Sequence, residues 1–273
     1  MGSSRDRFAA LVAAGPDLAR GALEIARLGH PDLDAEACLA RLDALAETIR
    51  PHLPAGDDPP TTFAAAATHL FGELGFHGNS TDYYDPRNSY LPDVLERRTG
   101  IPIMLALVLI EVGTRLGLTV EGIAFPGHFL VRVRGARGLH LFDPFTGQAL
   151  DEAELLSRAR AVAGAGVTAV PPHFLATAGP RAMLTRMLHN LLRVFHERDD
   201  PDHALAAVDL LLVLTPDAPE AVRTRGLLLA RLDCPGAAAH DLERYLELAP
   251  GAADAADIRN QLARLARGLP TLH

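Results

Sequence analysis

The stretch Gly100–Phe145, "GIPIMLALVLIEVGTRLGLTVEGIAFPGHFLVRVRGARGLHLFDPF", carries the pattern that decides the fold. It predicts an apolar helix over Ile103–Leu116 that ends at Gly117, because the apolar run is bounded by Pro102 and by that glycine. A strand is expected over 118–124, and two more follow around a basic, glycine-containing turn. Helices followed by neighbouring strands predict an α+β fold with an antiparallel sheet rather than a doubly wound fold.

His128 and Asp143 stand in this stretch at the head of one short strand and at the end of the next. On adjacent antiparallel strands such residues lie close enough to interact. Acyl transfer through a thiol requires a nucleophile, a base and an acid that orients the base. We therefore take His128 and Asp143 as a candidate catalytic dyad. Two alternatives stay open, a polar binding pocket and a hydrogen-bonded pair that only locks two strands.

The nucleophile of such a dyad is missing from its expected place. In transglutaminase-like and papain-like arrangements a cysteine opens the helix before the sheet, where the helix dipole lowers its pKa. Here Pro102 fits the first helical position, and residues 102–104 include no Cys, Ser or Thr. The nucleophile is expected within these residues, Pro102 to Met104, so the sequence leans against an enzyme.

Four residues are candidates for lining a pocket near the dyad: Asn88, Ser89, Met104 and Glu111. Asn88 and Ser89 lie near the end of the turn-rich segment "GFHGNSTDYYDPRNSYL", which is predicted to cover the core or to have a functional role. Asn88 is either a helix cap or a pocket residue, and Ser89 is the best alternative nucleophile. Glu111 lies inside the apolar helix, so it must be paired or neutralised; it is either in an ion pair with an arginine or in a pocket wall.

The C-terminal part of the chain contains an internal repeat. "LTPDAP" at 214 and "LAPGAA" at 248 are 34 residues apart, and Ala204 and Ala238 keep the same offset. A 34-residue helical period with small residues where helices cross is typical of tetratricopeptide repeats (TPR). Residues 181–273 are therefore predicted to be an all-α, TPR-like region with a surface for a protein or peptide partner.

The strings "NSYLPDVLERRTGIPIMLALVLIEVGTRLGLTVEGIAFPGHFLVR" and "LFDPFTG" resemble the transglutaminase-like domain of the bacterial SirB1 family. In that family a tetratricopeptide region follows, and "RTRGLLLARLDCPGAAAHDLERYLELAP" resembles it. The resemblance implies a papain/transglutaminase-like core, with His128 and Asp143 at the histidine and aspartate positions. The family often has a hydroxyl residue where this chain has Met104.

Composition excludes several functional classes. The net charge is −8 and every basic residue is an arginine, so Schiff-base chemistry and a P-loop lysine are excluded. Without an Arg-rich arm we expect no nucleic-acid partner. The longest uncharged apolar run, 101–110, is too short to span a membrane, and the N-terminus does not resemble a secretory signal. Two cysteines far apart and scattered histidines predict a reducing cytoplasm, no metal and no cofactor.

The expected organisation is N-terminal helices over 1–60, a transglutaminase-like α+β domain over 61–175 and the TPR-like region over 181–273. We expect a protein- or peptide-binding adaptor or regulator with little or no catalysis. The alternative is a hydrolase or acyltransferase that uses His128 and Asp143 without a cysteine nucleophile. A regulator that binds a small ligand is a third possibility, but no residue pattern in the sequence supports it.

Overall fold

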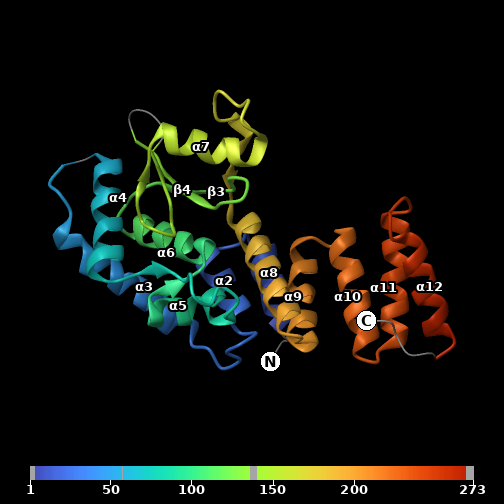
Figure 1. The fold of residues 1–273 in the computed structure, drawn as a ribbon. Coiled ribbons are helices and arrows are strands. Elements are labelled where there is room, and N and C mark those ends of the chain that lie inside the picture. The colour runs from blue at the N-terminus through green and yellow to red at the C-terminus, as the bar shows by residue number, and fades with distance from the viewer. Residues whose placement is uncertain (1–3, 57, 136–139, 269–273) are drawn as a thin grey trace. The chain divides into compact units, whose positions relative to one another are not determined.

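The computed structural model describes residues 4–56, 58–135 and 140–268 (Figure 1). By its internal contacts the chain divides into two compact units. One unit is Pro16–Met187, here called the core unit. The other combines Met1–Gly15 with Leu188–His273 and is here called the repeat unit. The predicted α+β core and all-α repeat region are both confirmed.

Four helices of the core unit begin at an aspartate cap. Side chains of Asp17, Asp34, Asp58 and Asp151 each accept a backbone N–H of the first helical turn, which removes an unsatisfied donor there. The α-helices are α2 (Leu18–Ala26), α3 (Ala35–Ile49), α4 (Pro59–Thr68), α5 (Leu91–Arg97), α6 (Pro102–Arg115) and α7 (Glu152–Ala163). A π-helix over His69–Glu73 continues α4, and 3-10 helices cover Arg50–His52, Pro86–Ser89 and Pro172–Leu175.

The sheet of the core unit has five strands, and all its pairings are antiparallel. In spatial order they are β6 (Ala149–Leu150), β5 (His140–Phe142), β4 (Leu130–Val133), β3 (Val120–Ile123) and β7 (Thr177–Ala178). The strand β7 lies between α7 and the helix that begins at Pro180. Its two residues pair with Gly122 and Ile123 of β3, and a strand this short has no readable alternation.

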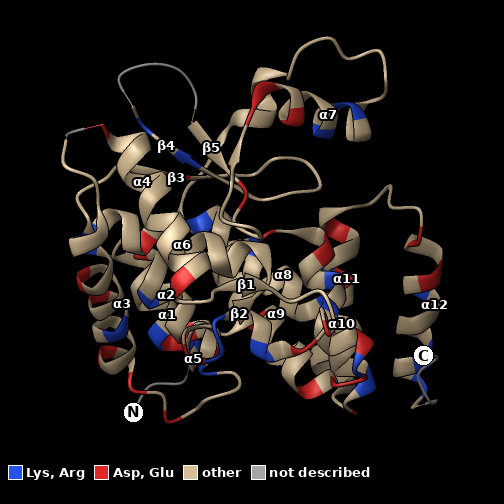
Figure 2. Cartoon of the chain, turned by 60° about the vertical axis from the view of Figure 1, so that its left-hand side comes forward, with Lys and Arg blue, Asp and Glu red and all other residues tan. Residues whose placement is uncertain are grey.

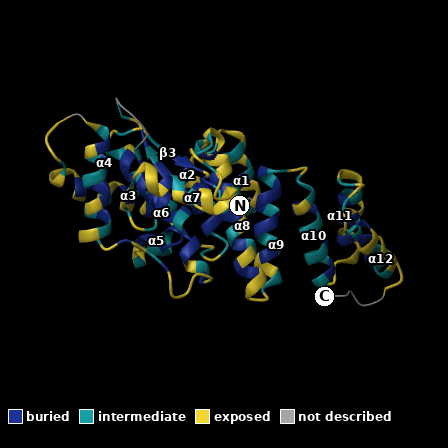
Figure 3. Ribbon diagram, turned by 45° about the horizontal axis from the view of Figure 1, so that its top comes forward, coloured by how far each residue is buried: buried dark blue, intermediate teal, exposed yellow. Residues whose placement is uncertain are grey.

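The two faces of the sheet pack against different helices, as Figure 1 shows for α6 and α7. One face joins α7 in an apolar cluster that includes Ile123, Leu130, Leu141, Leu155 and Ala159. The opposite face packs against α6 and α4. There a Cβ at Gly113 of α6 would lie 2.5 Å from Val120 of β3, and the rings of Phe63 and Phe142 meet edge to face. Ten of the fourteen residues of α6 are buried (Figure 3).

A second pairing joins the turn-rich segment to the start of α6. The short strands β1 (His77–Gly78) and β2 (Thr99–Gly100) are parallel. Gly78 lies directly under the ring of Phe145, because a Cβ there would come within 2.0 Å of it. The segment predicted to cover the core is thus fixed to the end of β5.

The repeat unit consists of helices that pair in chain order. They are α1 (Ser4–Ala13), α9 (Pro201–Leu214), α10 (Pro219–Arg231), α11 (Pro235–Leu248) and α12 (Ala255–Ala266), together with the second half of α8 (Pro180–Glu197). α10 packs against α9 and α11, α11 packs against α12, and α1 packs against α9. Gly226 shows why the repeat needs small residues, since a Cβ there would lie 2.9 Å from the side chain of Leu242.

Acidic and basic residues are interspersed along the helices (Figure 2). On α7, for example, acidic residues occupy the first turn and an arginine the last. This arrangement suits the macrodipole of the helix. Among the helices that the structure describes, none is long and apolar enough to cross a bilayer.

Candidate functional site

His128 ends a tight turn that enters β4. Its N–H donates to the carbonyl of Phe125 at 3.0 Å. Pro126 and Gly127 occupy the two central positions, and Gly127 has a φ of 75°, as a type II turn requires. The residue as a whole stays open to solvent. The pKa of His128 is nonetheless lowered, first by partial burial of the ring and then by the charge of Arg158, while Asp143 opposes the shift.

Asp143 is buried directly after β5 and is held from two sides. Its Oδ1 accepts the N–H of Phe145 at 2.8 Å, and its Oδ2 accepts Nη2 of Arg158 at 2.7 Å. Arg158 lies on α7, so the carboxylate ties the end of β5 to the helix that covers this face. In the part of the chain that the structure describes, no hydrogen bond joins the His128 ring to Asp143. The charge of Asp143 acts on the His128 ring, but the hydrogen bond that would orient the base of a catalytic dyad is not formed among the described residues.

The head of α6 contains Ile101, Pro102, Ile103 and Met104. Met104 is only 1% exposed and Ile103 is 2% exposed. The N–H of Met104 donates to the carbonyl of Ile101 at 3.0 Å, as in a regular first turn. At the place where the sequence analysis expects a nucleophile, this chain therefore has a thioether inside the core.

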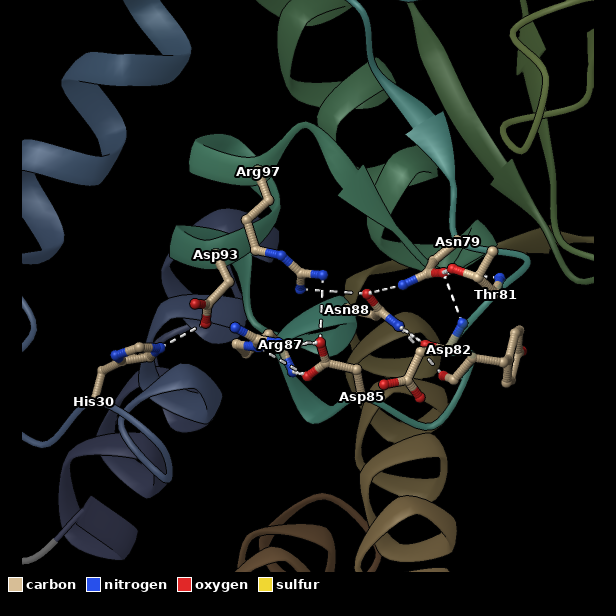
Figure 4. Close-up of polar contacts among 10 residues, drawn as sticks. His30, Asn79, Thr81, Asp82, Asp85, Arg87, Asn88, Asp93 and Arg97 are labelled. Carbon is tan, nitrogen blue, oxygen red and sulfur yellow. Dashed lines mark hydrogen bonds and ion pairs between the residues drawn. The ribbon is translucent and has the colours of Figure 1, made fainter.

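Asn88 lies at the centre of a buried polar network (Figure 4). Its amide oxygen accepts Nδ2 of Asn79 at 3.0 Å and a more distant N–H of Arg97 at 3.4 Å. Its own Nδ2 donates to the carbonyl of Asp82 at 2.7 Å, and its carbonyl accepts the N–H of Ile101 at 3.2 Å. Asn88 thereby links the turn-rich segment to the residue that precedes α6.

Asp85 completes the same network through two arginines. Its carboxylate contacts Arg87 at 2.8 Å and Arg97 at 3.3 Å. Burial alone would raise the pKa of Asp85, but the hydrogen bonds and charge of Arg87, with the charge of Arg97, hold it below its usual value. The carboxylate is therefore ionised and paired at neutral pH.

Ser89 and Glu111 lie in different surroundings. Ser89 is 3% exposed, and its hydroxyl is buried without a hydrogen-bond partner. Glu111 pairs with Arg115 one turn later at 2.6 Å, and burial raises its pKa while Arg115 works against that rise. Within the described residues, no hydrogen bond or ion pair connects Asn88, Ser89 or Glu111 to His128 or Asp143.

Two arginines near the dyad were missed by sequence reasoning. Arg158 reaches Asp143 from a helix fifteen residues further on, and Arg186 of α8 lies over the ring of Phe129 with its guanidinium carbon 5.9 Å from the centroid. Both contacts are non-local, and an arginine on an amphipathic helix gives no signal in a single sequence.

Metal ligands do not gather anywhere in the described ranges, where no group of three or more His, Cys, Asp or Glu side chains is placed to hold an ion. Cys38 is buried, and that burial raises the pKa of its thiol. Cys234 is exposed at the start of α11, where its thiol donates to the carbonyl of Leu232.

The repeat unit has a cavity of about 470 Å³ between its helices. Its apolar lining includes Leu192 and Phe195 of α8 and Leu227 and Leu228 of α10. Gln261 of α12 is the buried polar residue of the lining, with 8% of its surface exposed. A cavity of this size and lining is typical of ligand sites.

Comparison with known proteins agrees with this architecture. Residues 36–189 match the family described as the transglutaminase-like superfamily, and residues 191–263 match a tetratricopeptide repeat family. A UPF0162 protein of Xylella fastidiosa is 42% identical over 247 residues, which are 89% of this chain and 88% of that protein. A UPF0162 protein of Vibrio cholerae is 30% identical over 263 residues, which are 94% of this chain and 96% of the relative.

More distant similarities cover less or are weaker. F-box only protein 21 of Mus musculus is 36% identical over 171 residues, which are 60% of this chain and 26% of the mouse protein. A crystal structure of menin aligns with a TM-score of 0.42 and 12% identity over 97% of this chain and 75% of the menin chain. The family match and the two bacterial relatives show that the chain belongs to the UPF0162 family of transglutaminase-like proteins.

Proposed function

We propose that this protein is an adaptor that holds a peptide segment of a partner protein in the cavity of its repeat unit. In this proposal its transglutaminase-like domain has no cysteine nucleophile and catalyses little or no reaction. The resemblance to the SirB1 family and a place in the reducing cytoplasm belong to the same proposal. The observation that carries it is the cavity between α8, α9, α10 and α12.

The cavity offers an apolar wall for one or two large side chains. Leu192 and Phe195 line it from α8, and Leu227 and Leu228 line it from α10. Leu227 and Leu228 are only partly buried, so a partner that covers them removes further apolar surface from water. Such burial contributes ~25 cal/mol for each Å² of apolar area.

Gln261 supports a peptide as the occupant. Its side chain is nine-tenths buried and lines the cavity, and it makes no hydrogen bond within the described residues. A primary amide has both donors and an acceptor, which match the carbonyl and the N–H of a peptide backbone. The amide has no hydrogen-bond partner in the described part of the chain, so a peptide backbone can pair with it without breaking a bond inside the protein.

Two of the charged residues that line the cavity are arginines, and the acidic one, Asp200, is already bonded to His203; we therefore expect an acidic peptide. Arg223 and Arg231 lie two turns apart on α10, and each pairs with one carboxylate, from Asp254 and Asp199 respectively. The Asp199 side chain is 80% exposed, so its ion pair contributes little to stability. A carboxylate of the ligand therefore replaces Asp199 on Arg231 at little cost. The proposed occupant is a short segment with a large apolar side chain and a nearby Asp or Glu.

The alternative function is a hydrolase or acyltransferase that relies on His128. Its lowered pKa keeps the imidazole neutral at pH 7 and able to accept a proton. Two arrangements speak against it: Asp143 is bonded to Arg158 and Phe145 rather than to His128, and buried Met104 occupies the head of α6.

The adaptor proposal is tested by selecting phage-displayed random peptides on the full-length chain and measuring the best binder by fluorescence polarisation. We expect enrichment of peptides that combine Leu, Phe or Met with Asp or Glu. Arg231→Glu should weaken the selected peptide by about tenfold or more, since it places like charges together. Gln261→Leu should also weaken it.

The matched control is Arg259→Glu, the same charge change at an exposed position of α12, which should leave binding unchanged. Failure to enrich any sequence, or enrichment of basic peptides, would overturn the proposal. An equal loss of binding in Arg231→Glu and in Arg259→Glu would show that only the overall charge of the unit matters.

A further inference from the structure

The turn that presents His128 lies at the end of the sheet, between α7 and α8. On one side, a Cβ at Gly127 would lie 3.7 Å from Val162 of α7. On the other side, Phe129 covers Gly122 together with Met183 of α8: a Cβ at Gly122 would lie 2.7 Å from the ring of Phe129 and 3.0 Å from the Met183 sulfur. His128 is therefore flanked by two helices that approach from opposite faces of the sheet.

Each of these helices places one arginine beside the turn. Arg158 of α7 uses Nη2 to bond Asp143, and its side chain remains 24% exposed. A guanidinium has five N–H donors, so one bond to Asp143 leaves most of them for another acceptor. Arg186 of α8 lies over the ring of Phe129, the residue after His128. A cation–π contact of this kind leaves the in-plane N–H donors of the guanidinium unsatisfied.

The charges around His128 do not balance. Arg158 and Asp143 neutralise each other across 2.7 Å. Arg186 has no carboxylate partner among the described residues, so one positive charge is left over. The pKa of His128 agrees with this excess: after partial burial of the ring, it is Arg158 and Arg186 that lower the pKa, and Asp143 alone that raises it. The site has an excess of donors and positive charge in a chain whose net charge is −8.

We propose that His128, Arg158 and Arg186 form a binding site for an oxyanion, the carboxylate or phosphate group of a small molecule or of a peptide. Arg186 supplies the unpaired charge, Arg158 supplies free in-plane donors, and the neutral imidazole of His128 donates its ring N–H. Asp143 is a positioning residue, since it fixes Arg158 and does not itself face an anion. The site lies in the core unit and is independent of the peptide cavity of the repeat unit.

The test is an NMR titration of the histidine rings in the full-length chain. The His128 signal is assigned from its loss in His128→Gln, and inorganic phosphate, glutarate or sodium chloride is added at constant ionic strength. We expect a saturable shift of the His128 ring signal with phosphate or glutarate and none with chloride. The bound anion should also raise the pKa of His128, since it stabilises the imidazolium. Whichever of the two saturates at lower concentration identifies the class of anion.

Variants separate a built site from general charge. Arg186→Gln should weaken the saturable binding by about tenfold or more, since it removes a charged donor, and Arg186→Lys, which keeps the charge, should restore part of it. The matched control is Arg160→Gln on α7, whose side chain donates to the carbonyl of Val167 and should leave anion binding unchanged. An unshifted His128 signal, a shift shared equally with chloride, or equal binding in Arg186→Gln and wild type would overturn the proposal. Each of these results leaves the peptide selection on the repeat unit unaffected.

Discussion

Replacing Asn88 with alanine tests whether the buried network is what fixes the turn-rich segment to α6. Asn88 is fully buried, and its side chain bridges Asn79 and the carbonyl of Asp82. Alanine removes these two short hydrogen bonds and the longer one from Arg97, and it leaves the Asn79 Nδ2 group, which is also buried, without its acceptor. The backbone bond from Ile101 to the Asn88 carbonyl remains possible in the variant.

The expected loss follows from these contacts. Each of the two short hydrogen bonds contributes ~1 kcal/mol net, and a buried donor left unsatisfied costs a further ~1–3 kcal/mol. Together they give a loss of about 4 kcal/mol in the free energy that keeps this segment closed. Since each 1.4 kcal/mol is about a factor of ten, the population of the opened segment should rise roughly a thousandfold.

Hydrogen exchange measured by mass spectrometry is the appropriate assay, because it reports local opening of one segment in a chain with two units. The Ile101 amide, which donates to the Asn88 carbonyl, is the reporter. Asn260→Ala, at an exposed position of α12, is the control and should leave exchange at Ile101 unchanged. The double variant with Asn79→Ala should lose less than the sum of the two single losses, because the residues share a bond. An increase in Ile101 exchange of less than about tenfold in Asn88→Ala would refute the reasoning.

Three further changes are predicted from contacts elsewhere. Gly78→Ala should lower the melting temperature, because a Cβ there would come within 2.0 Å of the Phe145 ring; Gly179→Ala, with open space around it, should be nearly neutral. Gly226→Val should destabilise the repeat unit by ~1–3 kcal/mol, measured by urea denaturation and circular dichroism, because the new side chain would clash with Leu242. An unchanged denaturation midpoint would show that the close approach of α10 and α11 at this position is not needed for stability. Burial raises the pKa of Glu111, so the folded state binds the Glu111 proton more tightly than the unfolded state does. The contribution of Glu111 to stability therefore falls as the pH rises from its unfolded pKa through its raised folded pKa. Glu111→Gln should therefore flatten the decline of the melting temperature over that window, and an identical pH profile in the variant would contradict this.

Local patterns in the sequence are enough to locate the main helices and the repeat. The apolar run after Pro102 predicts a helix over Ile103–Leu116, and α6 covers Pro102–Arg115. The 34-residue offset of the repeat recurs in the structure, where α9 and α11 begin at Pro201 and Pro235. Periodicity and helix boundaries depend on neighbouring residues, and for that reason one sequence suffices to find them.

The contacts that define the candidate site depend on residues far apart in the chain. The sequence shows that Asp143 ends a strand, but not that Arg158 of α7 is its partner. The helical pattern of 4–13 does not reveal that α1 packs against α9, and the two residues of β7 are too few to show alternation. In each case the partner is chosen by packing of whole elements, which local propensity does not encode.

Polar groups whose hydrogen bonds are satisfied inside the protein stabilise the fold, whereas accessible polar groups without such bonds are available to bind a ligand. Asn88, Asp85 and Asp143 have their hydrogen bonds satisfied inside the protein, and satisfied networks of this kind make a core rigid and specific. A polar group left unpaired in a native protein requires an explanation. The Ser89 hydroxyl is sealed from solvent, so no ligand reaches it and it gives no evidence of function.

Gln261 and Arg186 differ from Ser89 in one respect: each is unpaired where a ligand has access. The Gln261 side chain lines a cavity, and Arg186 flanks the solvent-exposed turn of His128. Because neither side chain has a hydrogen bond or ion pair among the described residues, the fold does not depend on its polar contacts. Substituting either should therefore change binding with little loss of stability, whereas substituting Asn88 should do the reverse. Measuring both quantities for these positions separates the two roles.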